Sequence, residues 1–274
     1  MAIKSMEAIT DYKIVSIDRR DRAFLCTCAL LFIASTWGTI AWCGSMADGM
    51  PMPGGWTMSM AWMRMADQTW VGAAATFMGM WVLMMVAMML PSLAPMLARY
   101  RRAVGGRDAA HLRSMTALAG AGYFLVWTVV GAAAYPLGIG VAAAEMQWPA
   151  LARAVPLAAG VVLLLAGYVQ LTAWKARHLE CCRGALTSGG ARSADARGAW
   201  KHGLRLGMHC AWCCCGFMVA LLVSGVMDLN VMALVATAIT VERLVPAAQR
   251  AARASGVGLI ALGSLVIARA IGIA

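Results

Sequence analysis

The chain has 274 residues, of which 62% are hydrophobic and only 13% are charged, with a mean hydropathy of +0.73. A soluble domain of this length carries more polar surface than this, and a disordered chain is far more polar still. These values therefore predict a protein that lies in a lipid bilayer. The net charge of +11 does not indicate a nucleic-acid-binding domain, because in an apolar chain basic residues set the membrane topology.

Seven apolar stretches are long enough for the roughly 20 residues of helix that cross a bilayer. They lie at 23–43, 70–98, 115–138, 154–174, 206–227, 229–247 and 255–273. The sequence thus predicts an all-α fold, a polytopic transmembrane helix bundle of about seven spans in a single domain, 23–273. Because Glu242 and Arg243 fall inside the sixth stretch, a bundle of six spans is the alternative.

The distribution of basic residues indicates how the bundle is oriented. Of the 23 Lys and Arg, 20 lie before the first span or in alternate connections, whereas Arg64, Arg153 and Arg269 fall on the other side. Lys and Arg collect in cytoplasmic loops, so we expect residues 1–22 to form a cytoplasmic N-terminal segment. The expected location is a bacterial inner membrane, with the lipid bilayer as the first partner.

Sulfur is the second unusual feature, with 22 Met and nine Cys against four His. Seven methionines fall in the predicted outer loop, 44–69: Met46, Met50, Met52, Met58, Met60, Met63 and Met65. An exposed loop has no core to fill, and a thioether binds Cu(I) without first losing a proton. The alternative is that this loop folds back onto the membrane surface and buries its methionines.

The predicted helix over 70–98 continues the pattern with two stripes of methionine. At about 100° per residue, one stripe lies on one face and the other on roughly the opposite face. The first contains Met78, Met85, Met89 and Met96, and the second contains Met80, Met84 and Met88. We assign the first stripe as candidate ligands because it extends over about 27 Å of helix. Packing is the alternative for both, since Met commonly fills gaps in a bundle.

The densest group of candidate ligands opens the predicted helix over 206–227, where five His and Cys residues occur in seven positions. On a helix, His209, Cys210, Cys213 and Cys214 share an arc of about 140°, while Cys215 points away. One turn of helix could therefore hold one metal ion. A disulfide within this group is disfavoured, because neighbouring helical cysteines have poor bridging geometry.

Two more thiols, Cys181 and Cys182, lie in the predicted cytoplasmic loop 175–205, among basic residues that would stabilise thiolates. Thiolates and thioethers together select Cu(I), which is the expected metal. Zinc is the alternative, because His209 with three Cys would satisfy a tetrahedral ion. A protein that donates or accepts the metal is an expected partner, and nucleic acid is not.

Two acidic residues lie at membrane depth or close to it. We expect Glu242 to pair with Arg243 or with another base at the inner surface. We expect Asp228, in the short link before the sixth stretch, to cap the helix that follows it.

Three linked motifs resemble those of a known family. They are the run Met84–Met96 with Pro91 and Pro95, the run Tyr168–Lys175 with Cys181 and Cys182, and Cys210-x-x-Cys213-Cys214 followed by Gly225–Leu229 and Glu242. Over most of 70–247 the chain resembles a bacterial family of unknown function, described as predicted metal-binding integral membrane proteins and sometimes labelled copper chaperones. The resemblance implies metal binding in the membrane without fixing an activity.

The leading hypothesis is an integral membrane protein that handles Cu(I), by uptake, delivery or storage, with outer Met and inner Cys ligands. One alternative is a structural or assembly subunit whose sulfur-bearing residues only pack. The other is a membrane copper or thiol oxidoreductase. No catalytic residue is assigned, and no Gly-rich phosphate loop is present to couple transport to a nucleotide.

Overall fold

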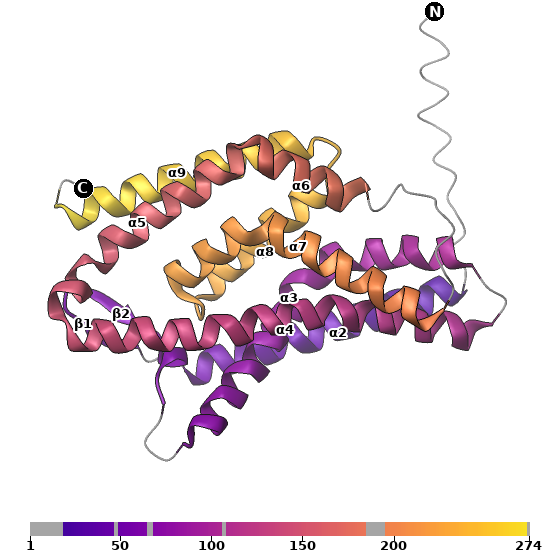
Figure 1. Ribbon diagram of the computed structural model, residues 1–274, viewed down its shortest axis with the longest axis horizontal. Helices are drawn as coiled ribbons and strands as arrows, with labels where there is room; N and C mark the ends of the chain where they lie inside the picture. The colour runs from indigo at the N-terminus through magenta and orange to yellow at the C-terminus, as the bar shows by residue number, and fades with distance from the viewer. Residues whose placement is uncertain (1–18, 47–48, 65–67, 106–107, 185–194, 273–274) are drawn as a thin grey trace, which may run out of the picture.

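The structure is a computed structural model that describes residues 19–46, 49–64, 68–105, 108–184 and 195–272. Its elements are α2 (Arg19–Ser45), β1 (Met50–Met52), β2 (Trp56–Met58), η1 (Met60–Trp62), α3 (Trp70–Val104), α4 (Ala109–Gln147), α5 (Pro149–Leu171), α6 (Ala173–Gly184), α7 (Ala196–Gly225), α8 (Leu229–Leu244) and α9 (Ala248–Ala270). The predicted all-α bundle is confirmed (Figure 1). Most of the segment 1–22, Met65 and the loop residues 185–194 lie outside the described residues.

Among the described residues, six helices are long and apolar enough to cross a membrane, namely α2, α3, α4, α5, α7 and α9. The stretch expected at 229–247 instead forms α8, whose 16 residues fall short of the roughly 20 that span a bilayer. The structure thus agrees with six spans, the alternative to seven. As predicted, Asp228 caps this helix, because its carboxylate accepts hydrogen bonds from the backbone amides of Asn230 and Val231.

The centre of the bundle is formed by α3 and α7. In the most apolar 18-residue stretch of each helix, 50% of the residues of α3 and 56% of those of α7 are buried. The corresponding share is 11 to 28% in the other four spans. Helix α2 packs on α3, α4 packs along α7, and α5 pairs with α9. In Figure 1, α3 changes direction along its length. The prolines Pro91 and Pro95 lie inside this helix, and each removes one backbone hydrogen bond.

Small residues let neighbouring helices approach one another closely. A side chain at Gly203 of α7 would collide with the carbonyl oxygen of Ala119 in α4. In the α5–α9 pair, Gly160 faces Gly263 and Gly167 faces Gly256. Membrane helices gain little hydrophobic energy by leaving lipid, so such close backbone contacts are a main source of their association.

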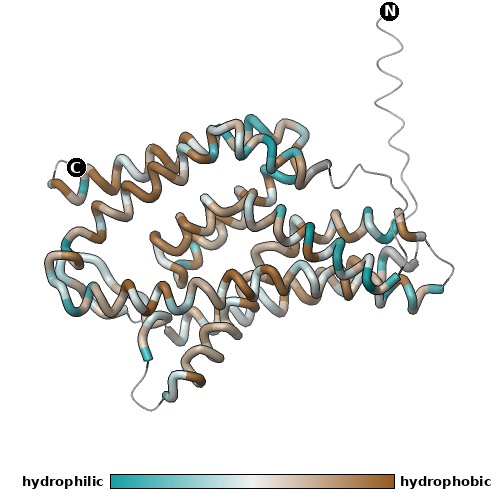
Figure 2. Tube along the Cα trace, viewed as in Figure 1, coloured by the Kyte–Doolittle hydropathy of each residue, from teal (hydrophilic) through white to brown (hydrophobic). Residues whose placement is uncertain are grey.

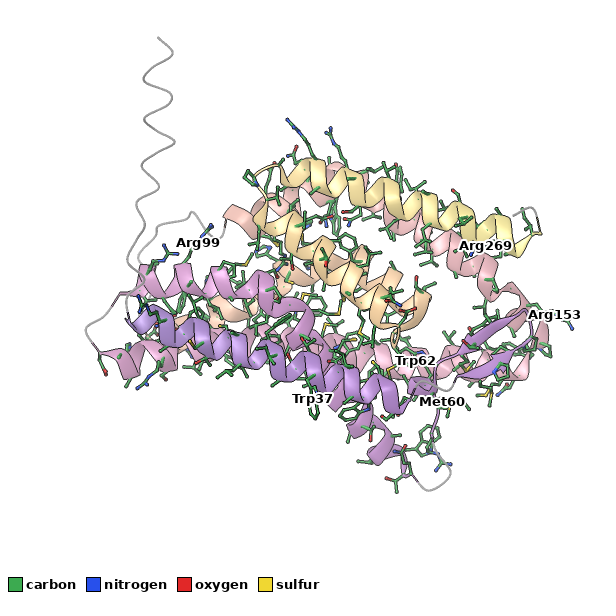
Figure 3. The ribbon with its side chains drawn as sticks, turned by 180° about the vertical axis from the view of Figure 1, so that it is seen from behind. Trp37, Met60, Trp62, Arg99, Arg153 and Arg269 are labelled. Carbon is green, nitrogen blue, oxygen red and sulfur yellow. The ribbon has the colours of Figure 1, made fainter. Side chains whose placement is uncertain are left out.

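The two ends of the bundle differ in polarity. Hydrophilic residues gather where α3 ends and where α4 and α7 begin (Figure 2). Arg99 lies at that end, whereas Arg153 and Arg269 lie at the opposite end (Figure 3). The 39 residues of α4 extend over about 58 Å, longer than the roughly 30 Å of hydrocarbon, so this helix also projects beyond the bilayer.

The methionine-rich segment folds against the end of the bundle that carries Arg153. Strands β1 and β2 pair antiparallel, and the turn between them holds Gly54 and Gly55, both with positive φ. The indole of Trp56 donates a 2.9 Å hydrogen bond to the carbonyl oxygen of Ala152. Met58 is buried, and Met50 is the only exposed methionine among the described residues of this segment. The loop thus packs against the bundle but buries only Met58 of its described methionines, and its folding onto the membrane surface stays a prediction.

Candidate metal centre

Four cysteine thiols from two helices meet in the core near the middle of α7. The thiols of Cys182 of α6 and Cys213, of Cys213 and Cys214, and of Cys214 and Cys210 lie close enough to interact. All four are at most 2% exposed, and all nine cysteines of the chain are free. The α-helical spacings of three and four residues bring Cys210, Cys213 and Cys214 onto one face, as the sequence predicts.

A thioether extends this series of thiols. The sulfur of Met89, on α3, lies 3.9 Å from the sulfur of Cys210. The hydroxyl of Tyr123, on α4, lies 2.9 Å from the same Cys210 sulfur. We call the five residues Cys182, Cys213, Cys214, Cys210 and Met89, in their order of contact, the sulfur string.

Buried charges flank the sulfur string on the α6 and α8 side. The Lys175 ammonium donates a 2.6 Å hydrogen bond to the carbonyl oxygen of Cys213 and forms a 2.8 Å ion pair with Glu242. Gln170 donates to the same Glu242 carboxylate at 3.3 Å. The prediction that Glu242 pairs with a base is therefore confirmed, and that base is Lys175.

A second buried cation contacts the string directly. The Arg243 guanidinium donates to the Cys214 sulfur at 3.7 Å and to the Ser92 hydroxyl at 3.2 Å. Ser92 in turn donates to the carbonyl oxygen of Met89, so the proline-containing stretch of α3 is linked to α8. Lys175, Arg243 and Glu242 together bring two positive charges and one negative charge to the thiols.

The protonation of the two α6 residues follows from these contacts. The hydrogen bond with Cys213, and then burial, raise the pKa of the Cys182 thiol above its usual range, so that the metal-free thiol keeps its proton. Burial alone would lower the pKa of Lys175, but the nearby Cys213 and Glu242 outweigh it and raise that pKa. Lys175 therefore stays positively charged beside the string.

The segment 175–205, which carries Cys182, was expected to be a loop, and this is wrong for residues 175–184, which lie in α6, and for 196–205, which lie in α7. Residues 173–184 form α6, in which Lys175, Leu179 and Cys182 are each 1% exposed. Their spacing of four and three residues places them on one face of a helix, which docks against α7. Docking brings Cys182 to the string and leaves Cys181 exposed.

The structure brings four of the predicted cysteine and histidine ligands together and leaves the others outside the group. Cys182, Cys210, Cys213 and Cys214 come together, whereas Cys181 points away from them. The His209 side chain is half-buried, and its backbone carbonyl, rather than its imidazole, accepts a 3.1 Å hydrogen bond from the Cys182 thiol. Cys215 is half-buried and outside the string, as its helical position predicts.

The two methionine stripes of α3 are both inside the bundle. Of the predicted stripe, Met85, Met89 and Met96 are buried and Met78 is half-buried, and only Met89 has a described contact with a thiol. Met80, Met84 and Met88 of the second stripe are at most 3% exposed. Because α3 is the central helix, burial does not distinguish the two stripes, and ligation by Met78, Met85 or Met96 stays a prediction.

The thiols contact one another in sequence and do not surround a common point. Among the described residues, no three His, Cys, Asp or Glu side chains are arranged to hold a metal ion. A tetrahedral zinc site needs four such ligands, whereas Cu(I) accepts thioether sulfur and a smaller set of soft ligands. The pair Cys210 and Met89 supplies adjacent ligands of this soft kind.

Sequence comparison identifies the family. A family model described as copper chaperone, PpoB2, matches residues 78–266, which is more than two thirds of the chain. The chain belongs to the PpoB2 copper chaperone family. The matched range contains all five residues of the sulfur string and its buried charges. No match was found in the comparisons with curated proteins and with solved structures. Family membership and the six apolar helices make this a copper-related, multi-pass membrane protein.

Two residues that contact the sulfur string, Tyr123 and Arg243, were not predicted from the sequence as part of the site. Tyr123 lies 87 positions from Cys210, in an apolar helix where nothing in the local pattern distinguishes it. Arg243 was expected only as a charge that weakens a span and as a partner for Glu242, not as a contact of a thiol. The sequence did contain an indication for Arg243, because a charged residue within an apolar membrane helix is costly and usually has a function.

Proposed function

We propose that this protein binds Cu(I) at the sulfur string and passes it to, or receives it from, another protein. The observation that carries the proposal is the burial of four thiols and one thioether in mutual contact, within a membrane protein of a copper chaperone family. Packing alone does not account for the string, because three of its thiols also make polar contacts. Cys210 contacts the Tyr123 hydroxyl, Cys214 accepts from Arg243, and Cys182 donates to the His209 carbonyl oxygen.

Charge balance favours Cu(I) over zinc. The side chains of Lys175, Arg243 and Glu242 leave one surplus positive charge beside the thiols. Cu(I) bound by two thiolates carries one net negative charge, which this surplus neutralises. Zinc bound by four thiolates would carry two negative charges and leave one uncompensated, and an uncompensated buried charge is costly.

The direction of transfer follows from the orientation that the basic residues predict. The basic residues predict that the end with Arg99 is cytoplasmic, which puts the opposite end, where Met60 and Arg153 lie, on the outer side. The cysteines near the middle of α7 lie between these two ends. Thiolates hold Cu(I) more strongly than thioethers, so copper would move from the outer methionines toward the string. The membrane potential also favours inward movement of a cation.

The test is a measurement of copper stoichiometry in the full-length protein. Protein purified in detergent under reducing, anaerobic conditions is loaded with Cu(I) in the presence of a Cu(I) chelator, and bound copper is counted by mass spectrometry. We expect about one tightly held copper per chain, and we expect C210S/C213S/C214S to lose it. Retention of tightly bound copper by this variant would overturn the proposal.

The matched control is C215S, which changes a fourth cysteine of the same helix outside the string. It should keep the tightly bound copper. Equal losses in C215S and in the triple variant would indicate a general effect of the substitutions on α7.

A further inference from the structure

A second group of sulfur atoms gathers at the end of the bundle where Met60 and Trp62 lie (Figure 3). A pocket there is lined by Met46 after α2, Met60 and Met63 at η1, Met80 of α3 and Met227 in the α7–α8 turn. We call these five residues the methionine pocket. They come from four separate parts of the chain, so the fold itself assembles them.

The pocket is lined mainly by methionine and aromatic side chains. Trp42, Phe77 and Tyr135 supply aromatic walls, and none of the described lining residues is charged. Gln68, Thr76 and Tyr135 add a few polar atoms, but the described walls hold no carboxylate for a hard cation and no positive charge for an anion. Thioethers bind Cu(I) or Ag(I), and an aromatic face also attracts a cation.

A sixth sulfur lies directly behind the pocket. The Cys43 sulfur is 3.8 Å from the sulfur of Met227, and Cys43 is only 5% exposed. Methionines that serve as packing material fill the space between helices, whereas these thioethers border an open space. The arrangement is therefore more than gap-filling by Met.

We propose that the methionine pocket is a second binding site for a soft monovalent metal ion and that it loads the sulfur string. Helix α3 links the two sites, because it contributes Met80 to the pocket and Met89 to the string. These positions are about 13.5 Å apart along the helix. A site made of thioethers binds more weakly than one that includes thiolates, so the metal passes downhill in free energy. The loading role depends on the proposed function of the string, but metal binding by the pocket does not.

Silver titration of the full-length protein tests the pocket separately from the string. Ag(I) replaces Cu(I) because it is a soft monovalent ion that is not oxidised in air. Calorimetry is carried out in a common background in which Cys26, Cys28, Cys181 and Cys215 are replaced by Ser, which removes the thiols outside both sites. We expect one strong and one weaker binding event.

The pocket variant is M60L/M63L/M227L, which keeps apolar volume and removes three thioethers. It should lose the weaker event and keep the stronger one, whereas C210S/C213S/C214S should show the reverse. The matched control M50L/M52L changes two methionines of β1 that do not line the pocket, and it should keep both events. An unchanged weaker event in the pocket variant would overturn the inference, as would an equal loss in the control.

A measurement on the unsubstituted protein covers the case in which the pocket variant fails to fold. Methionine oxidation by dilute peroxide is followed by mass spectrometry with and without Ag(I). Bound silver should protect Met60 and Met63 and leave the exposed Met50 unprotected. Equal oxidation of Met60 with and without silver would contradict the inference, whatever the result at the string.

Discussion

The hydroxyl of Tyr123 and the sulfur of Cys210 lie 2.9 Å apart, although 87 residues separate them in the chain. Helices α4 and α7 can bring the two together because Gly203 and Gly207 of α7 allow the α4 backbone to approach closely. A hydroxyl on α4 thus orients a thiol on α7, and three elements, α3, α4 and α7, meet at Cys210.

The first prediction concerns Tyr123. Replacing it with Phe removes one hydrogen bond to Cys210, which is worth about 0.5–1.5 kcal/mol, and so should weaken Cu(I) binding roughly two- to tenfold without changing the stoichiometry. Competition with a Cu(I) chelator measures the change. Y168F, which alters an exposed tyrosine, should bind as the unchanged protein does. Equal affinity in Y123F would show that the hydroxyl has no part in the site.

The second prediction separates two adjacent cysteines. Cys182 is buried in the sulfur string and Cys181 is exposed. C182S should weaken Cu(I) binding by about tenfold or more, since it replaces a soft sulfur ligand with a hard hydroxyl, whereas C181S should leave it unchanged. Maleimide labelling before loading gives an independent measure, in which Cys181 reacts quickly and Cys182 slowly. Equal effects of the two substitutions would contradict the docking of α6.

The third prediction concerns the ion pair of Lys175 and Glu242. E242Q leaves the Lys175 charge buried without its carboxylate partner, which should lower the free energy of unfolding by about 3–5 kcal/mol. Denaturant titration in detergent measures it. The double variant K175M/E242L removes both charges and should recover a large part of the loss. E180Q, at an exposed carboxylate, should change stability by less than about 0.5 kcal/mol.

The fourth prediction concerns the approach of α4 and α7. G203A places a methyl group against the Ala119 carbonyl oxygen and should destabilise the protein by about 1–3 kcal/mol, because the backbone must shift. G140A, in α4, meets no atom within 4 Å and should be neutral or slightly stabilising. A thermal melt compares the two variants. If G203A melts at the same temperature as the unchanged protein, the α4–α7 contact is not as close as described.

Local periodicity made much of this structure predictable. Six apolar spans and the shared face of Cys210, Cys213 and Cys214 follow from residues close in sequence. The contribution of Cys182 does not, because it depends on a short amphipathic helix docking against a distant one. The choice between the methionine stripes stays a prediction, because α3 is central and burial of both of its methionine faces does not distinguish them.

X-ray absorption at the copper edge of the loaded, full-length protein tests the central claim most directly. We predict the spectrum of Cu(I) with sulfur as the only nearest neighbour, a spectrum that C215S keeps and C210S/C213S/C214S loses. Nitrogen or oxygen ligands at the tightly bound copper, or a Cu(II) edge under reducing conditions, would contradict the assignment of the sulfur string.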